Sequence, residues 1–278
     1  MPIILVFLMA GGLAIFIGSM RWLKVNFQIV EFSGLPDHLR GLRILHISDL
    51  HSDHLTRKNL DIWPRVGGLD FDIAVITGDI IRGRRRNEPG NSRYLLPHQN
   101  SLARLAERVP TFFVEGNHES RIFPEMREFL ENIGIIVLYN QRYTLTVGRG
   151  DVDIIGTMDY STMNLRGWGG LRDLLAENHG NFQIMLTHQP QVIDTVKPSG
   201  ISLVLAGHTH GGQVRLPLLP ALYAPNQGLL PRYSHGLYRH GDAQMFVSRG
   251  IGTTYFPIRF FNRPEIAIIE LRRSGHEF

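Results

Sequence analysis

The sequence predicts a mixed α/β fold in which two β-sheets pack against each other with helices on the outside. Short apolar runs rich in β-branched residues recur along the chain, and such runs are typical of buried strands. Segments with helical spacing alternate with these runs in the first half, whereas strands crowd together near the end. At 278 residues the chain is long enough for one large domain or two smaller ones.

The individual elements are predicted in chain order. Val25–Phe32 alternates apolar and polar residues, as an edge or half-buried strand does, and Pro36–Arg40 is a polar linker before the globular domain begins in earnest at Leu42. The strands expected after that point are Ile44–Ile47, Ile73–Ile76, Phe112–Val114, Ile184–Leu186, Leu203–Leu205, Met245–Val247 and Glu265–Leu271, together with a hairpin formed by Tyr143–Val147 and Val152–Ile155. The helices expected are Leu55–Trp63, Ser101–Glu107, Pro124–Ile133 (closed by Gly134) and Leu171–Glu177.

Composition excludes several classes of protein. Charged residues are 19% and hydrophobic residues 43%, an ordinary globular balance. The formal net charge of +4 does not demand a nucleic-acid-binding surface, and no nucleic-acid partner is expected. The absence of cysteine rules out disulfides, thiolate metal ligands and a cysteine phosphatase mechanism. Composition does not predict the oligomeric state.

The first 24 residues are expected to form a membrane anchor, with the domain occupying residues 25–278. Residues 3–20 carry no charge, and a membrane-spanning helix needs about 17–25 apolar residues. Trp22 between Arg21 and Lys24 resembles an interfacial anchor. The alternatives are a cleaved signal peptide and a buried core helix. Because the flanking basic residues follow the span, a single-pass protein of the cell membrane with a cytoplasm-facing domain is expected.

Polar side chains follow five of the predicted buried strands. The groups are Asp49-Leu50-His51, Gly78-Asp79, Gly116-Asn117-His118-Glu119, Thr187-His188 and His208-Thr209-His210. Open α/β sheets place their sites at the carboxyl ends of strands, so carboxylate, amide and imidazole groups are expected to converge at one edge. This layout predicts a metal site.

The spacing of these groups suits two cations. Two residues separated by one in an extended strand point the same way, so Asp49/His51 and His208/His210 can each supply two groups to one cavity. A single carboxylate, Asp79, can bridge two cations, which lie about 3.5–4 Å apart in two-metal hydrolases. Mixed nitrogen and oxygen ligands suit Mn²⁺, iron or Zn²⁺ better than Ca²⁺.

The same five groups, in the same order, resemble the motifs of the calcineurin-like metallophosphoesterase superfamily across Leu42–Leu271. Further strings, Gly207–Gln213, Val247–Thr254 and Asn262–Glu265, resemble the membrane-associated bacterial branch that includes the YkuE, YaeI and LpxG phosphoesterases. Many relatives carry Asp shortly after the Gly-Asp, where this chain has Ile80-Ile81-Arg82, a difference that concerns substrate detail. The resemblance implies a four-layer αββα sandwich of two mixed sheets flanked by helices.

The resemblance also implies roles for the motif residues. One divalent ion would be held by Asp49, His51, Asp79 and His210, and the other by Asp79, Asn117, His188 and His208. A metal-activated water would then attack phosphorus. His118 would be a catalytic residue that stabilises charge or protonates the leaving oxygen, with Asp49 able to orient it.

Two segments are candidates for substrate contact. Arg82, Arg84, Arg85 and Arg86 lie just beyond Asp79 and could grip a phosphate or diphosphate, or else form a solvated loop. Val214–Tyr233 is rich in Leu, Pro and Tyr and could be an acyl-chain groove or a membrane-facing patch, or else a buried strand pair.

Together these features predict a membrane-anchored phosphoesterase that hydrolyses a phosphodiester or diphosphate bond. The resemblance adds UDP-2,3-diacylglucosamine hydrolysis in lipid A synthesis as a candidate reaction, so that the expected partners are a phosphorylated or lipidic small molecule and membrane lipid. One alternative is an exported nucleotide or cell-envelope phosphodiesterase. A second is a non-catalytic scaffold, which the complete set of motif residues argues against.

Overall fold

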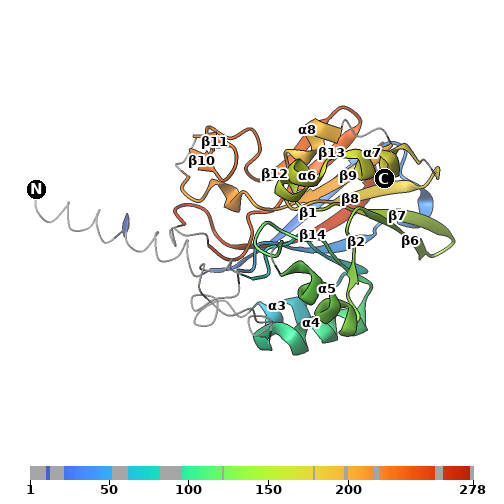
Figure 1. The fold of residues 1–278 in the computed structure, drawn as a ribbon, viewed down its shortest axis with the longest axis horizontal. Coiled ribbons are helices and arrows are strands. Elements are labelled where there is room, and N and C mark those ends of the chain that lie inside the picture. Colours follow the sequence, from blue (N-terminus) through green and yellow to red (C-terminus); the bar gives the residue numbers. More distant parts are fainter. Residues whose placement is uncertain are drawn as a thin grey trace, which may run out of the picture.

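The computed structural model describes residues 11–12, 22–51, 62–81, 96–120, 122–177, 179–196, 200–215, 219–253 and 259–275. Two six-stranded sheets stack on each other, and helices cover the outer side of each sheet (Figure 1). The predicted α/β sandwich of two mixed sheets is thereby confirmed.

The first sheet combines both ends of the described domain with its early strands. Its strands, in spatial order, are β1 (Lys24–Phe32), β14 (Glu265–Arg273), β2 (Arg43–Ile47), β3 (Ile73–Ile76), β4 (Thr111–Phe113) and β5 (Ile136–Val137). β2 to β5 run parallel, β14 is antiparallel to β2, and β1 is parallel to β14 with Lys24 opposite Glu265. The predicted strand at Val25–Phe32 is therefore an edge strand.

The second sheet is parallel at its centre and antiparallel at both edges. Its strands, in spatial order, are β12 (Gly236–His240), β13 (Ala243–Val247), β9 (Ile201–Ala206), β8 (Phe182–Leu186), β7 (Gly150–Gly156) and β6 (Gln141–Val147). β6 and β7 form the predicted hairpin. A separate pair, β10 (Tyr223–Ala224) with β11 (Gly228–Leu229), lies beside the second sheet (Figure 1).

The alternation of side chains along the central strands creates the layers. Ile44 and Val75 point between the sheets, whereas Leu45 and Ile76 pack under the helices of the first sheet. Those helices are α3 (Trp63–Gly67), α4 (Leu96–Arg108) and α5 (Phe123–Asn132). Met185 and its neighbours pack in the same way under α6 (Tyr160–Arg166), α7 (Gly169–Ala176) and α8 (Val192–Val196). Strands buried on both faces explain the continuous apolar runs in the sequence.

Several predicted boundaries differ from the structure. Most of the helix expected at Leu55–Trp63 lies outside the described residues, and α3 begins at Trp63. The expected linker contains a 3-10 turn, η1 (Asp37–Leu39), because Leu39 is buried between the sheets. The short elements α6, α8 and β12 were not predicted, since five to seven residues are too few to establish a period.

The expectation of a single-pass membrane protein is contradicted. Within the part of the chain that the structure describes, no helix has both the length and the apolar character needed to cross a bilayer. Of the span expected at residues 3–20, Gly11 and Gly12 alone belong to that part. β1 begins at Lys24, the last residue of the expected anchor, and the boundary between residues 24 and 25 stays a prediction.

Candidate metal centre

The candidate site lies at one edge of the sandwich, where parallel strands of both sheets end. β2, β3 and β4 of the first sheet and β8 and β9 of the second lead into the loops that carry the motif residues. The structure brings His and Asp side chains together in three overlapping groups, each with ligand atoms within 4.8 Å of one another. The groups are Asp49/His51/His210, His51/Asp79/His118 and Asp79/His188/His208.

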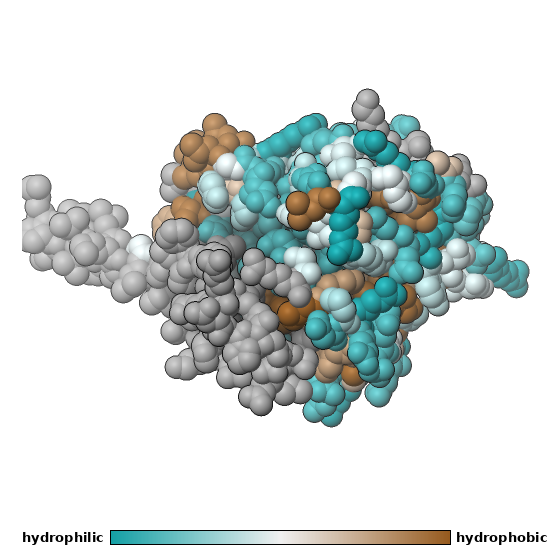
Figure 2. Space-filling view, viewed as in Figure 1, coloured by the Kyte–Doolittle hydropathy of each residue, from teal (hydrophilic) through white to brown (hydrophobic). Residues whose placement is uncertain are grey.

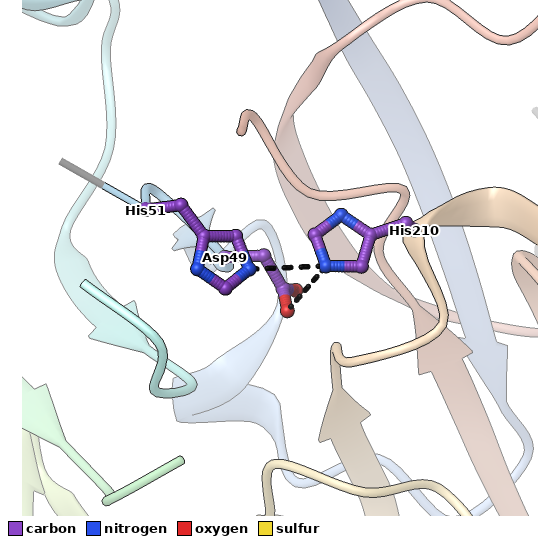
Figure 3. A group of neighbouring side chains, drawn as sticks. All are labelled: Asp49, His51 and His210. Atoms are coloured by element: carbon purple, nitrogen blue, oxygen red, sulfur yellow. Dashed lines mark hydrogen bonds and ion pairs between the residues drawn. The ribbon is translucent and has the colours of Figure 1, made fainter. Parts of the chain in front are cut away.

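The first group joins the loop after β2 to the loop after β9 (Figure 3). Nε2 of His51 lies 3.1 Å from Nε2 of His210, and the rings stack with centroids 5.0 Å apart. Nε2 of His210 lies 3.5 Å from Oδ1 of Asp49. Two nitrogens and a carboxylate oxygen from distant parts of the chain therefore face a common point.

Asp79 connects the three groups. Its Oδ2 lies 3.2 Å from Nε2 of His188 and 3.7 Å from Nε2 of both His51 and His118. Its Oδ1 accepts the backbone N–H of His118 at 3.0 Å. One carboxylate therefore faces imidazoles that belong to both halves of the predicted centre.

The remaining predicted ligands gather around His188. Its Nε2 lies 3.1 Å from Oδ1 of Asn117 and 3.0 Å from Nδ1 of His208. The structure thus brings together all seven residues predicted as metal ligands. It also places Nε2 of His118 3.7 Å from Oδ2 of Asp79, and the orientation of His118 by Asp49 stays a prediction.

The sequence predicted that the side chains of Asp49/His51 and of His208/His210 point the same way because the backbone is extended there. The backbone has a different conformation. Five of the predicted ligands have positive φ: Asp49 (50°), His51 (43°), Asp79 (53°), His208 (69°) and His210 (48°). The chain is therefore not extended at Asp49–His51 or at His208–His210, and simple strand alternation does not explain their convergence. Non-glycine residues in this region are strained by roughly 1–3 kcal/mol each and cluster at functional sites.

A buried carboxylate that the prediction left without a role holds two of these loops together. Glu119 accepts the backbone N–H groups of Asp79 (2.8 Å), Ile81 (3.2 Å) and Gly116 (2.8 Å). The loops after β3 and β4 approach so closely that a Cβ on Gly78 would lie 2.4 Å from the nitrogen of Gly116. Glu119 belongs to the Gly116–Glu119 motif, but its role depends on a contact with Asp79, which is 40 residues away in the sequence.

Buried hydrogen bonds orient two of the imidazole rings, those of His51 and His188. Nδ1 of His51 faces the carbonyl of Ile81 at 3.3 Å, and Nδ1 of His188 faces the carbonyl of Thr77 at 2.7 Å. A carbonyl only accepts, so each ring donates from Nδ1 and presents Nε2 to the site. Asp49 is held by Ser48 Oγ at 2.6 Å and by the backbone N–H of His208 at 2.9 Å.

Charge is strongly redistributed within the group. Burial raises the pKa of Asp49 to about 6 and lowers the pKa of His51 to about 4. Burial also acts on Asp79, but the neighbouring imidazoles of His188, His118 and His51 outweigh it and hold the pKa of Asp79 well below its usual range. For His188, the carboxylates of Asp79 and Asp49 outweigh burial, and its pKa lies well above the usual value.

The donor set fits divalent cations. The raised pKa of His188 indicates a point where buried acceptors converge and favour positive charge. The two close nitrogen pairs, at 3.0 and 3.1 Å, have the spacing of two ligands at right angles around one ion with bonds of about 2.1 Å. Imidazole and carboxylate ligands favour Mn²⁺, iron or Zn²⁺.

The two predicted substrate segments have different outcomes. Arg82, Arg84, Arg85 and Arg86 lie outside the described residues. Within Val214–Tyr233, the structure has a short strand pair, as one alternative predicted, but the pair is only partly buried, since Ala224 is buried and Tyr223 is exposed. Leu229 is 80% and Leu230 67% exposed, and Figure 2 shows hydrophobic surface over this part of the molecule.

Comparison with known proteins identifies the family. The profile described as calcineurin-like phosphoesterase matches residues 42–212. The chain belongs to the calcineurin-like phosphoesterase family. It is 32% identical to the metallophosphoesterase YkoQ of Bacillus subtilis over 255 residues, which cover 89% of this chain and 90% of that protein.

Two further members of the family align over most of their length. The metallophosphoesterase YkuE of Bacillus subtilis is 28% identical, with 91% of this chain and 87% of that protein covered. The phosphodiesterase YaeI of Escherichia coli is 29% identical, with 84% of both chains covered. This calcineurin-like phosphoesterase is therefore a metal-dependent phosphoester hydrolase, and the scaffold alternative is not supported.

Proposed function

We propose that this phosphoesterase hydrolyses a phosphodiester or diphosphate bond at a centre of two divalent cations. Asp49, His51, Asp79 and His210 would hold one cation, and Asp79, Asn117, His188 and His208 the other. The observation that carries this proposal is the position of Asp79, whose Oδ2 lies within 3.7 Å of imidazoles from both halves. Bound divalent cations supply Lewis-acid activation of a phosphoryl oxygen and lower the pKa of water.

The protein's own groups prepare the site for this chemistry. Six of the seven proposed ligand side chains are buried and Asn117 is half-buried, and buried hydrogen bonds hold Asp49, His51 and His188, so little reorganisation is needed during the reaction. His118 differs from the other site histidines because its side chain is 18% exposed. It lies at the mouth of the site, where it can meet the leaving oxygen of a substrate and donate a proton from its ring.

Specificity for a diester is supported by the name of one relative. The name phosphodiesterase belongs to YaeI, which is 29% identical. An amphiphilic substrate such as UDP-2,3-diacylglucosamine is the finer form of the proposal. It is supported by the exposed apolar side chains of Leu219, Tyr223, Leu229 and Leu230, which lie on or beside the strand pair that contacts η3 (His210–Gly212).

The proposal is tested by metal analysis combined with a substrate panel. The purified protein is loaded with Mn²⁺, freed of excess ion and assayed with an aryl phosphomonoester, an aryl phosphodiester, a nucleotide sugar and UDP-2,3-diacylglucosamine. We expect two cations per chain and turnover of the diester that is lost in chelator and restored by Mn²⁺. A folded chain that binds no divalent ion would contradict the metal centre, and turnover of the monoester alone would contradict the substrate class. Release of UMP from the acylated nucleotide sugar separates the finer proposal from the coarser one.

A further inference from the structure

Arg259 is a fully buried arginine beside the candidate metal centre. Its side chain is 0% exposed, and it is among the largest completely buried side chains of the described protein. No carboxylate within the described ranges lies within ion-pair distance of it. A buried guanidinium without a direct carboxylate partner is unfavourable unless its N–H groups are well satisfied. The partners of Arg259 therefore indicate its role.

Those partners are the carbonyls of one loop. Nε and Nη2 both donate to the carbonyl of Gly252, Nε at 3.1 Å. Nη2 also approaches the carbonyls of Arg249 (2.9 Å) and Gly250 (3.2 Å). The guanidinium of Arg259 thus contacts three carbonyls of the loop after β13, residues 249–252. These contacts hold the backbone of that loop in place.

The loop at residues 249–252 forms the floor beneath Asp49 and His51. Its backbone N–H groups donate to the carbonyl of Asp49 from Ile251 at 3.2 Å and from Gly252 at 2.6 Å. A Cβ on Gly250 would lie 2.6 Å from Cβ of Asp49, and one on Gly252 would lie 2.7 Å from Cβ of His51. Any shift of this loop therefore displaces the two ligands that follow β2.

Arg259 also reaches the third ligand of the same half. Nη2 lies 3.3 Å from Nδ1 of His210, so the guanidinium packs against the imidazole of this residue. The neighbouring Asn262 holds the backbone of His210, because its Nδ2 donates to that carbonyl at 2.6 Å. Arg259 therefore touches both loops that supply Asp49, His51 and His210.

We propose that Arg259 is a positioning residue for one half of the centre, holding Asp49, His51 and His210 so that they face a common point. The half formed by Asn117, His188 and His208 has other supports, namely the carbonyl of Thr77 and the loop held by Glu119. The part of this inference that concerns cations rests on the proposed two-cation centre, whereas the positioning of side chains does not.

The test compares Arg259→Met and Arg259→Lys with the control Arg263→Gln. Arg263 is exposed and donates from Nε to the carbonyl of Trp22, away from the ligands. Cations per chain are measured after loading with Mn²⁺. We expect two in the unaltered protein and in Arg263→Gln, and about one in Arg259→Met, with an intermediate value for Arg259→Lys. Combining Arg259→Met with His210→Ala should remove no further cation, whereas combining it with His208→Ala should remove both.

A second measurement needs no cation. In the metal-free protein, Arg259→Met should change the ring nitrogen resonances of His51 and His210 and speed amide exchange at Ile251 and Gly252. The ring nitrogen resonances of His188 and His208 should not change in this variant. If the unaltered protein binds no Mn²⁺, the proposed function is contradicted. The histidine resonances of the metal-free protein then still test whether Arg259 positions His51 and His210.

Three results would overturn the inference. The first is that Arg259→Met retains two cations with unchanged affinity. The second is equal disturbance of the His188/His208 resonances and the His51/His210 resonances. The third is that Arg259→Met and Arg259→Lys both unfold under conditions where Arg263→Gln stays folded, because Arg259 would then support the fold as a whole.

Discussion

The two oxygens of the Asp79 carboxylate have different partners. Oδ1 is fixed by the backbone N–H of His118, and Oδ2 faces the imidazoles of His51, His118 and His188. Replacing Asp79 with Asn removes a negative charge from the centre and nearly conserves the shape of the side chain. This makes Asp79 the residue at which the electrostatic contribution can be separated from packing.

We expect Asp79→Asn to lower the rate of diester hydrolysis by at least about 100-fold, because several kcal/mol of charge stabilisation are removed from both halves of the centre. The amide keeps the volume of the side chain, so the variant should remain folded. The rate and the cation content are measured on the same preparation. Retention of two cations and near-normal turnover would exclude a bridging role.

His118 can be tested through the leaving group. Because it lies at the mouth of the site and can donate a proton, His118→Asn should slow hydrolysis of an alkyl leaving group by about 100- to 10,000-fold. A nitrophenol leaving group needs no proton, so the same variant should slow its release far less. Measuring kcat for a matched pair of diesters separates the two cases. Equal losses for both substrates would argue against proton donation.

The residues proposed as ligands could be singled out from sequence because they follow apolar strands closely, and the family resemblance supplied their assignment to two cations. Glu119 and Arg259 could not be assigned roles in the same way. Glu119 contacts the backbone of residues 79 and 81, which are far from it in the sequence. Arg259 contacts His210, which is also distant in the sequence, and Gly252, which lies in an irregular loop. Side chains that bind backbone atoms leave no recognisable spacing. Their roles therefore become visible only in the folded protein.

At the scale of elements, the loops after β3 and β4 are packed backbone to backbone. Gly78 has φ of +80°, and a Cβ there would also lie 2.6 Å from Cα of Gly116. Neither loop can move away, because Glu119 binds both. This contact sets the distance between Asp79 and Asn117.

Gly78→Ala should therefore destabilise the protein by roughly 3–5 kcal/mol, through an unfavourable backbone angle and a steric clash. Gly148→Ala is the matched control, since its φ is +61° and nothing lies within 4 Å of the added carbon. It should cost about 1 kcal/mol. Denaturant unfolding measures both, and similar losses for the two variants would show that the clash is relieved by loop movement.

Element prediction succeeded where a continuous apolar run or a clear strand pattern marked the segment, and it failed for short elements without either. The apolar run at Ile44–Ile47 and the hairpin at 143–155 were predicted because strand patterns and a glycine turn agreed. α6 is short and begins through a local cap in which Asp159 accepts the N–H of Ser161. β12 pairs with β13, and its half-exposed pattern resembles a loop.

At the scale of the whole molecule, stability should depend on pH and cations together. The pKa of Asp49 is raised to about 6 and that of Glu119 to about 8, both by burial first, and the carboxylates around His188 hold its pKa well above the usual value. A group whose pKa is raised in the folded state stabilises the protein below its unfolded pKa, and this contribution is lost as pH rises through the folded value. Metal-free protein should therefore lose stability as pH rises from about 7 to 9, whereas below about pH 6.5 the lowered pKa values of His51 and His208 act in the opposite direction.

Divalent cations should reverse this trend, because they bind the deprotonated ligands. Mn²⁺ at about 100 times its Kd should add about 2.7 kcal/mol, with a larger rise in Tm at high pH than at low pH. Thermal melts across pH, with chelator or Mn²⁺, measure the effect. A Tm of the metal-free protein that increases between about pH 7 and 9 would contradict the assignment of these shifts.

The order of strands in the first sheet has a consequence for biosynthesis. β14 is inserted between β1 and β2, so a strand that is translated late separates two that are translated early. Until residues 265–273 have left the ribosome, a nascent chain lacks β14. It therefore cannot complete this sheet, and β1 has no strand from β14 to pair with. Ribosome-bound chains arrested just before that point should be degraded by protease, and protection should arise abruptly once residue 273 has cleared the exit tunnel.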